Sequence, residues 1–299
     1  MIRIGVDFGG TKIEAAALGA DGRFLARVRA PSPPDYAEAL ATVRGLVARA
    51  EAEAGAEGAP VGVGGPGSAS PRDGLIRNAN SNQLNGKPFR RDLEAVLGRP
   101  VRLANDADCL ALSEAQDGAG EDAEVVFAAI LGTGCGGGLV VRGRLQSGRN
   151  AIGGEWGHTP LPWPDAHEYP GPRCWCGRRN CLELWISGPG FARDHGRGLT
   201  GEAVARAAET GDAAAAASLD RYVSRLARGL AVICDVVDPD VVVLGGGMSN
   251  VQALYERLPA AIGTHVFSDL FTTPVRPARH GDSSGVRGAA RLWPLEPAE

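Results

Sequence analysis

Lysine is nearly absent from this chain, which has only Lys12 and Lys87 against 29 arginines in 299 residues. Because alanine is abundant as well, we interpret this bias as one of coding rather than of function. The two signs of charge nearly balance, since 31 basic residues face 35 acidic ones. This balance leaves no electrostatic footprint for nucleic acid or for an anionic membrane.

Long apolar runs are missing too, because none reaches the ~18 residues that a membrane span needs. No signal sequence is recognisable at Met1, so we expect a reducing, cytoplasmic compartment. The GxxxxGK[ST] motif of P-loop proteins is absent as well. What remains is a globular chain long enough for two domains.

The apolar segments repeat one pattern of secondary structure twice. Each half begins with a strand, a glycine-rich turn and a second strand, and then alternates helices with further strands. The expected strands cover 2–7, 12–18, 23–28, 61–63, 102–104, 125–131, 139–141 and 241–244, and the expected helices cover 35–54, 105–116, 218–235, a segment from about 249, and 284–292.

This repetition predicts a duplicated α/β fold with a cleft between its halves. The small polar residues 118–122 mark the boundary. We therefore expect an N-terminal domain over 1–118 and a C-terminal domain over 119–283. The final segment, 284–299, is expected to return to the first domain and complete it.

Both glycine-rich turns are candidate phosphate sites. Gly132-x-Gly134-x-x-Gly137 formally matches the dinucleotide fingerprint, but that motif opens a helix, and the apolar segment 139–141 indicates a strand. Each turn carries a threonine, Thr11 or Thr133, beside glycines whose amides can approach an anion. Asp7 would repel a phosphate unless Mg²⁺ lay between them. One such turn is more often plain turn chemistry, whereas the matched pair favours a triphosphate site.

Two polar segments are candidates for binding and catalysis. Asn105-Asp106 ends an expected strand, where a carboxylate can accept the proton of an attacking hydroxyl, although these residues taken alone favour Asp106 as the cap of the following helix. The run 78–85 is rich in asparagine, which suits either a sugar site or a solvated loop.

A metal site is predicted from four residues. His158 and the cysteines Cys174, Cys176 and Cys181 supply the four N/S ligands of a closed structural zinc site. The alternative is a disulfide with a free thiol, which a reducing compartment disfavours. The other cysteines lie in apolar surroundings and are expected to be core residues.

Taken together, these motifs resemble those of the ROK family (repressors, open reading frames, kinases). The matching stretches are Asp7-Phe8-Gly9-Gly10-Thr11-Lys12, Asn105-Asp106, Leu131 to Gly138, Gly154-Glu155-Trp156-Gly157-His158, Cys174 to Cys181 and Gly245-Gly246-Gly247. Within the family, the stretches 78–81, 84–89, 158–163 and 280–288 look like bacterial manno(fructo)kinases. Acetamido-sugar kinases of the family are similar but less close.

The resemblance implies an actin/hexokinase-type, ribonuclease H-like fold with ATP and Mg²⁺ in an interdomain cleft, and Asp106 as general base. It implies sugar contacts from Asn80, Asn105, Asp106, Glu155, His158 and Glu183. It implies ATP contacts from Asp7, Gly9, Gly10, Thr11, Lys12, Gly132, Thr133, Gly134, Gly245, Gly246 and Gly247. Zn²⁺ would be held by His158, Cys174, Cys176 and Cys181, and the protein would be a homodimer.

The expected activity is phosphorylation of fructose at the 6-hydroxyl, with mannose and glucose as further acceptors. The alternative is an N-acetylglucosamine or N-acetylmannosamine kinase. A sugar-sensing repressor is disfavoured, because the first expected strand begins at Ile2 and leaves no room for a helix-turn-helix domain. Two residues depart from the family pattern: Gly65 replaces an aliphatic residue, and Asn180 replaces a glycine whose left-handed backbone asparagine tolerates.

Overall fold

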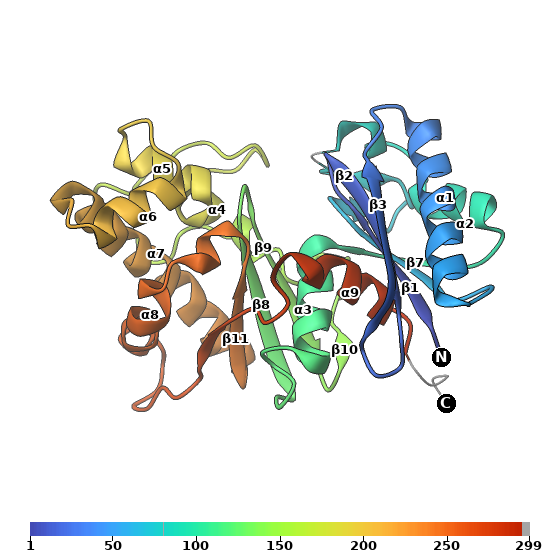
Figure 1. Cartoon of the computed structure of the whole chain (residues 1–299). Coiled ribbons are helices and arrows are strands. Elements are labelled where there is room, and N and C mark those ends of the chain that lie inside the picture. Colours follow the sequence, from blue (N-terminus) through green and yellow to red (C-terminus); the bar gives the residue numbers. More distant parts are fainter. Residues whose placement is uncertain (80, 295–299) are drawn as a thin grey trace. The chain divides into compact units, whose positions relative to one another are not determined.

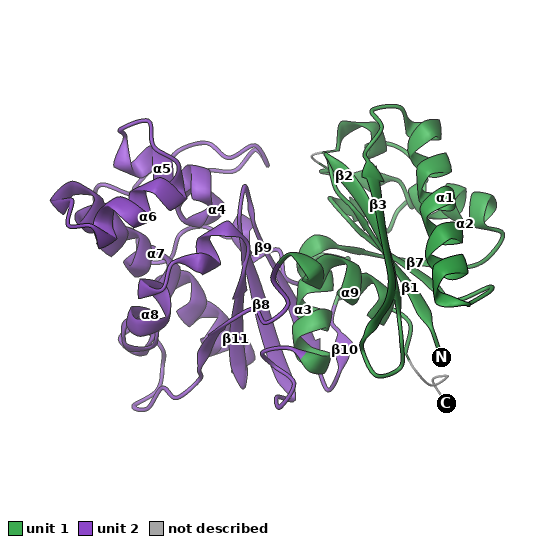
Figure 2. Ribbon diagram, viewed as in Figure 1, with its two compact units in different colours: residues 1–117, 147–153, 282–299 green, residues 118–146, 154–281 purple. Residues whose placement is uncertain are grey.

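The computed structural model describes residues 1–79 and 81–294, and this part of the chain forms two compact units (Figures 1 and 2). Unit 1 contains residues 1–117 and 147–153 and the segment from Asp282. Unit 2 contains residues 118–146 and 154–281. Each unit is built around its own five-stranded sheet.

The sheet of unit 1 has the order β3-β2-β1-β4-β7. Strand β2 pairs antiparallel with β1 and with β3, whereas β1, β4 and β7 are parallel. The strands are β1 Arg3–Phe8, β2 Lys12–Leu18, β3 Phe24–Pro31, β4 Val61–Gly65 and β7 Val101–Asn105, and a separate small hairpin joins β5 Ser68–Ala69 to β6 Ile76–Arg77.

The sheet of unit 2 has the order β10-β9-β8-β11-β12. Its strands are β8 Val125–Leu131, β9 Cys135–Val141, β10 Arg144–Leu145, β11 Val241–Gly245 and β12 Val275–Pro277. Three antiparallel strands are again followed by parallel ones, in the same sequence of neighbours as in unit 1. The duplicated pattern predicted from the sequence is therefore present.

The described residues of unit 1 form four helices: α1 Tyr36–Ala54, α2 Phe89–Leu97, α3 Asp106–Asp117 and α9 Ser284–Arg291. Helix α1 begins where the Asp35 side chain accepts the Glu38 amide and ends at Gly55 in the left-handed conformation. Helix α9 lies directly on the sheet, because a Cβ on Gly62 of β4 would meet the Ala289 carbonyl oxygen at 1.8 Å. Arg287 and Arg291 of α9 also pair with Asp117 at the end of α3.

Five further helices belong to unit 2: α4 Glu183–Ile186, α5 Gly188–His195, α6 Gly201–Glu209, α7 Ala213–Val237 and α8 Ala253–Gly263. Their buried side chains, including those of Tyr222, Leu226 and Leu230 on α7, form one apolar core with the sheet. The 3₁₀ turns of the described residues are η1 Asn82–Leu84, η2 Trp156–His158, η3 Gly247–Asn250 and η4 Gly281–Ser283.

Three expected elements begin more than one residue from the predicted start, and the sequence did not lead us to expect α2, α4, α5, α6, β5, β6, β10 or β12. Helix α7 begins at Ala213 rather than at Ser218, because Asp212 caps it and the following alanines favour a helix. Helix α8 begins at Ala253 rather than near Ser249, because η3 occupies the preceding residues. The second glycine turn is confined to 132–134, and β9 already begins at Cys135.

Packing explains why glycine continues into β9. A Cβ on Gly137 would lie 2.8 Å from Trp156 Cδ1 and 2.9 Å from Phe127 Cζ. The buried Trp156 indole also donates to the Gly136 carbonyl at 2.8 Å. Glycine in this strand therefore makes room for Trp156 rather than for a phosphate.

None of the helices in the described part of the chain combines the length and apolar character needed to span a bilayer.

Candidate functional site

The predicted catalytic pair lies where β7 ends and α3 begins. The Asn105 side-chain oxygen accepts the Asp108 amide at 2.7 Å, which is the hydrogen bond of an N-cap residue. The Asp106 carboxylate accepts the amide of the adjacent Ala107 at 2.9 Å, and the residue is exposed to solvent. The cap of α3 is therefore Asn105, and the alternative role of Asp106 as the capping residue does not hold.

The protein environment raises the pKa of two carboxyl groups at this site. Although the Asp106 side chain reaches solvent, the protein packed around the rest of it displaces water, and this desolvation raises the pKa of its carboxyl against backbone hydrogen bonds that lower it. Desolvation also raises the pKa of Asp7 to about 6, and repulsion by Asp106, Glu14 and Asp282 adds to that rise. A divalent cation bound at Asp7 would stabilise the ionised carboxylate against both its desolvation and the repulsion by its neighbours, so Asp7 fits the expected Mg²⁺.

The first glycine turn joins β1 to β2 within unit 1. The Gly9 amide donates to the Lys12 carbonyl at 3.0 Å, which closes the hairpin. Gly10 and Thr11 at its tip are exposed. The half-exposed Lys12 ammonium lies 4.0 Å from Glu14, in a loose ion pair that leaves it available to a phosphate.

The second and third glycine turns meet within unit 2. The Gly188 amide at the start of α5 donates to the Gly132 carbonyl at 2.8 Å. Gly246, at φ +82°, packs so closely on Leu131 that a Cβ would lie 2.6 Å from its carbonyl oxygen. The predicted turns at 132–134 and 245–247 are thus neighbours at the ends of β8 and β11.

Sequence reasoning missed two residues beside these turns. The first is Glu202, whose carboxylate would lie 2.8 Å from a Cβ on Gly247. The second is Gly188, which contacts the turn at 132–134 through its backbone amide. The sequence signal that could have revealed Gly188 is Ser187-Gly188-Pro189, because a serine cap followed by a proline marks the start of a helix, here α5.

A cavity of about 190 Å³ lies in unit 1 beside Asn105. Since one water occupies about 30 Å³, the cavity has room for a group the size of a sugar ring rather than for a single solvent molecule. Its lining combines apolar side chains with the buried Asp108. The lining residues are Val63, Gly65, Pro66, Gly67, Ser68, Ala69, Ile76, Leu84, Phe89, Leu103, Ala104, Asn105, Asp108, Ser147, Ala151 and Gly153.

The asparagine-rich segment 78–85 borders this cavity through Leu84. Asn85 has a structural task there, because its side chain accepts the Ala79 amide at 2.9 Å and donates to the Ala79 carbonyl at 2.8 Å. Asn80, the predicted sugar contact of this segment, lies outside the described residues.

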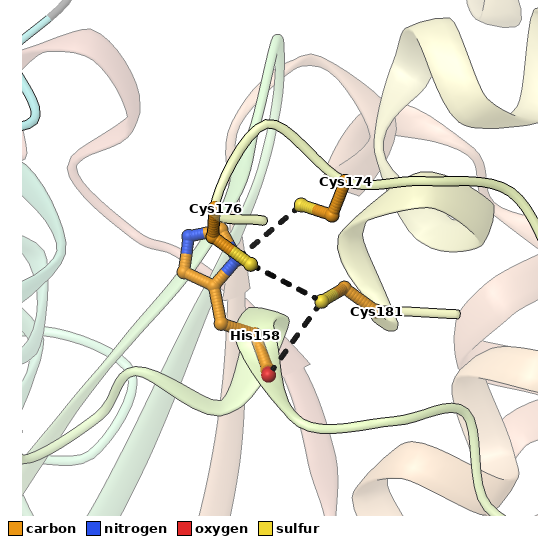
Figure 3. A group of neighbouring side chains, drawn as sticks. All are labelled: His158, Cys174, Cys176 and Cys181. Atoms are coloured by element: carbon orange, nitrogen blue, oxygen red, sulfur yellow. Dashed lines mark hydrogen bonds between the residues drawn. The ribbon is translucent and has the colours of Figure 1, made fainter. Parts of the chain in front are cut away.

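The predicted metal ligands gather in one group within unit 2, as Figure 3 shows. Their ligand atoms lie within 4.8 Å of one another, with 3.7 Å between Cys174 Sγ and His158 Nδ1 and 3.5 Å between Cys176 Sγ and Cys181 Sγ. Tetrahedral Zn²⁺ with bonds of about 2.0–2.3 Å needs ligand separations of this size. The sulfur separation is far beyond the ~2.05 Å of a disulfide, and all six cysteines are free.

The segment 158–181 carries the four candidate metal ligands and is called the metal loop. It adjoins the predicted sugar contacts of unit 2. Glu155 directly precedes η2, which carries His158. Glu183 begins α4, two residues after Cys181, and its carboxylate accepts the Trp175 indole at 2.8 Å and the Cys135 amide at 3.0 Å. Glu155 and Glu183 thus lie within three residues of a candidate metal ligand in the sequence.

The substitution at Asn180 preserves the turn, as predicted. Its φ of +60° is left-handed, and its side chain accepts the Trp185 indole at 2.8 Å. Asparagine therefore replaces glycine here and adds a hydrogen bond to α4.

Comparison with known proteins relates this chain to sugar kinases along nearly its whole length. The N-acetyl-D-glucosamine kinase of Vibrio vulnificus (strain YJ016) is 41% identical over 298 residues, which cover 96% of this chain and 98% of that protein. The crystal structure of a ROK hexokinase from Thermus thermophilus superposes with a TM-score of 0.87 at 34% identity, covering 97% of both chains. A ROK family glucokinase from Streptomyces griseus in complex with glucose and AMPPNP gives a TM-score of 0.78 at 28% identity, over 98% of this chain and 99% of that one.

The doubled sheets and these structural matches define an α/β protein of the actin/hexokinase type. A model of the ROK family matches residues 3–296, and the chain belongs to that family. The fold class and the family predicted from the sequence are confirmed. A sugar kinase is supported as well, whereas the preference for fructose is not, because the curated relatives at 41% identity are N-acetyl-D-glucosamine kinases.

Proposed function

We propose that this protein is an ATP-dependent kinase that phosphorylates N-acetyl-D-glucosamine at its 6-hydroxyl. The observation that carries the proposal is the 41% identity to N-acetyl-D-glucosamine kinases over 96% of the chain. The ROK glucokinase with glucose and AMPPNP supports a sugar and an adenine nucleotide as the pair of substrates.

Asp106 is the proposed general base. Its carboxylate does not cap α3, and its raised pKa brings it nearer to that of a group able to take up a proton at neutral pH. In the reaction it accepts the proton of the sugar hydroxyl while that oxygen attacks the γ-phosphorus of ATP, and ADP leaves. Asn105, fixed by its cap, is proposed to hydrogen-bond a neighbouring sugar hydroxyl.

The glycine turns are the proposed phosphate contacts. Gly10 and Thr11 are exposed at the first turn and Thr133 at the second, where backbone amides and hydroxyls can donate to phosphate, while the half-buried Gly9, Gly132 and Gly134 shape these turns. Gly245, Gly246 and Gly247 are the proposed adenosine contacts. Mg²⁺ held at Asp7 would neutralise triphosphate charge, while Lys12 adds a positive charge beside the first turn.

The cavity beside Asn105 fits an acetamido sugar. It places apolar side chains such as Val63, Leu84 and Phe89 opposite a few polar groups, including Asp108. An acetamido group has the same character, with a methyl that gains from apolar burial and an amide that needs hydrogen bonds. Gly65, which replaces a larger aliphatic residue, contributes to this space.

Fructose is the second candidate acceptor. The observation in its favour is the resemblance of the segments 78–81, 84–89 and 158–163 to manno(fructo)kinases. A pocket matched to free hydroxyls discriminates against an acetamido group through steric misfit and unpaired polar groups.

A coupled ADP-release assay over N-acetylglucosamine, N-acetylmannosamine, fructose, mannose and glucose tests the proposal. We expect the highest kcat/KM with N-acetylglucosamine, and phosphate at the 6-position in the product by NMR. A higher kcat/KM with fructose would identify fructose as the acceptor, and the assignment of kinase activity would still hold. No transfer to any sugar, with intact ATP binding, would refute the kinase itself.

Zn²⁺ is the proposed occupant of the metal loop, held by His158, Cys174, Cys176 and Cys181. Its role is structural: it fixes the segment that carries Glu155 and Glu183, which are proposed with His158 to bind the sugar. The homodimer implied by the family resemblance stays a prediction, which sedimentation velocity tests directly.

A further inference from the structure

Trp175 occupies an unusual position for a large aromatic side chain. It stands between two of the metal-loop cysteines, Cys174 and Cys176, and is 61% exposed. Its contacts nevertheless fix it on two sides. The ring edge meets the His158 imidazole, with centroids 4.8 Å apart at 84°, and the indole N–H donates to Glu183 Oε1 at 2.8 Å.

Glu183 is held at both oxygens, by two different segments. Oε1 accepts the Trp175 indole of the metal loop, and Oε2 accepts the Cys135 amide, the first residue after the turn at 132–134. The same Oε2 lies so near Gly134 that a Cβ there would be 2.9 Å away. One carboxylate thus joins the metal loop to the end of the second glycine turn.

We propose that Trp175 is a positioning residue, which transmits the order of the metal loop to Glu183 through its indole N–H and so fixes the carboxylate for sugar binding. The inference rests on the proposed sugar contact of Glu183. With the metal loop closed, the ring has one preferred place against His158, and its N–H then selects one orientation of the Glu183 carboxylate. Without that N–H, Glu183 keeps only the Cys135 amide and can rotate about it.

A purely structural role would give a different pattern. A side chain 61% exposed contributes little to the core, so its loss should not unfold the protein. A hydrogen bond to a charged carboxylate, in contrast, is among the stronger ones. Its loss should therefore appear in substrate binding rather than in stability.

The first test compares Trp175→Phe, which removes the N–H and keeps a ring, with Trp163→Phe. Trp163 is a matched control in the same unit, 55% exposed and stacked on His265 instead. We expect Trp175→Phe to raise the sugar KM about tenfold, with kcat and the KM for ATP within about twofold of wild type. Zinc content by elemental analysis should be unchanged, and Trp163→Phe should match the wild type throughout.

Two results of this test overturn the inference. An unchanged sugar KM in Trp175→Phe shows that the N–H does not position the carboxylate. Loss of zinc, or a parallel rise of both KM values, shows that Trp175 maintains the loop as a whole.

A second test does not depend on activity. The chain has five tryptophans, so ¹⁵N-indole labelling yields a short set of signals, and that of Trp175 is the one missing from Trp175→Phe. We expect Glu183→Gln to shift the Trp175 indole signal and leave that of Trp163 in place. An unmoved Trp175 signal refutes the contact even in an active enzyme. A wild type that phosphorylates no sugar refutes the proposed function, while the indole signal still tests the contact.

Discussion

The side chain of Asn105 accepts the Asp108 amide at 2.7 Å, and this bond separates the roles of two adjacent residues. Asn105 satisfies the orphan amide at the start of α3, so Asp106 is not required there. Asp106 follows immediately, exposed and with a raised pKa. The helix start thus presents a carboxylate that accepts only the adjacent Ala107 amide and is not needed as the cap.

Asp106→Asn should abolish phosphoryl transfer while both substrates still bind. Asparagine keeps the shape but cannot accept a proton, and loss of a general base costs about 10²–10⁴-fold in kcat. Steady-state kinetics with calorimetric titration of ATP and sugar measures both effects. A variant that retains more than about a tenth of wild-type kcat would assign the base to another residue.

Asn105→Ala should destabilise the protein, whereas Asp106→Asn should not. Loss of the cap costs about 1 kcal/mol, or about 2–4 °C in thermal midpoint, whereas Asp106→Asn leaves the midpoint nearly unchanged. Equal losses of stability in the two variants would contradict this division of roles.

Asp7→Asn should stabilise the ligand-free protein above pH 6. The folded pKa of about 6 exceeds the ordinary 3.8, so the folded state holds its proton longer than the unfolded chain. The free energy of unfolding therefore falls as pH rises between these values, by up to about 3 kcal/mol for the full shift. Neutral asparagine removes this loss.

Thermal midpoints from pH 4 to 8, measured for the wild type, Asp7→Asn and the exposed Asp269→Asn, test this pH dependence. We expect the Asp7→Asn curve alone to rise above wild type towards neutral pH. If all three curves run parallel, burial of the Asp7 carboxylate does not oppose its ionisation. The Asp7→Asn variant should also lose the Mg²⁺ dependence of ATP binding.

Two glycines of one motif should respond differently to alanine. Gly137→Ala collides with Trp156 and Phe127, so we expect a loss of about 1–3 kcal/mol in stability. Gly132→Ala meets nothing within 4 Å, so it should leave the thermal midpoint in place and raise the KM for ATP. Destabilisation by Gly132→Ala, or a stable Gly137→Ala, would reverse the assignment of packing and phosphate roles.

Purified protein should contain about one zinc per chain, bound by four ligands. Cys176→Ser should lose it together with much of the sugar affinity but less of the ATP affinity, because its loop adjoins Glu183. Cys234→Ser, a buried cysteine on α7, serves as the control that keeps its zinc. Elemental analysis that finds no zinc in reduced, unchelated protein refutes the site.

The sequence alone determined the elements whose signals are local. Strands β2 and β8 have the predicted bounds, because an apolar run beside a glycine turn begins or ends where the turn does. The sequence also sufficed to reject a dinucleotide-binding fold, because the residues after Gly138 favour a strand where that fold requires a helix. The cluster of four candidate metal ligands was also recognisable, because three cysteines within eight residues are typical of a metal site and not of an apolar core.

Only the tertiary structure decided roles that depend on a partner distant in the chain. Asp108 faces a cavity shared with Ser147 and Gly153, and Gly137 is small because Trp156 packs on it. Glu183 acquires its orientation from Trp175 and Cys135, which lie 8 and 48 residues away. No local pattern encodes such contacts, because they arise only when β9, η2 and the metal loop fold against one another. Composition and spacing thus specify which residues carry the chemistry, whereas packing specifies where their side chains point.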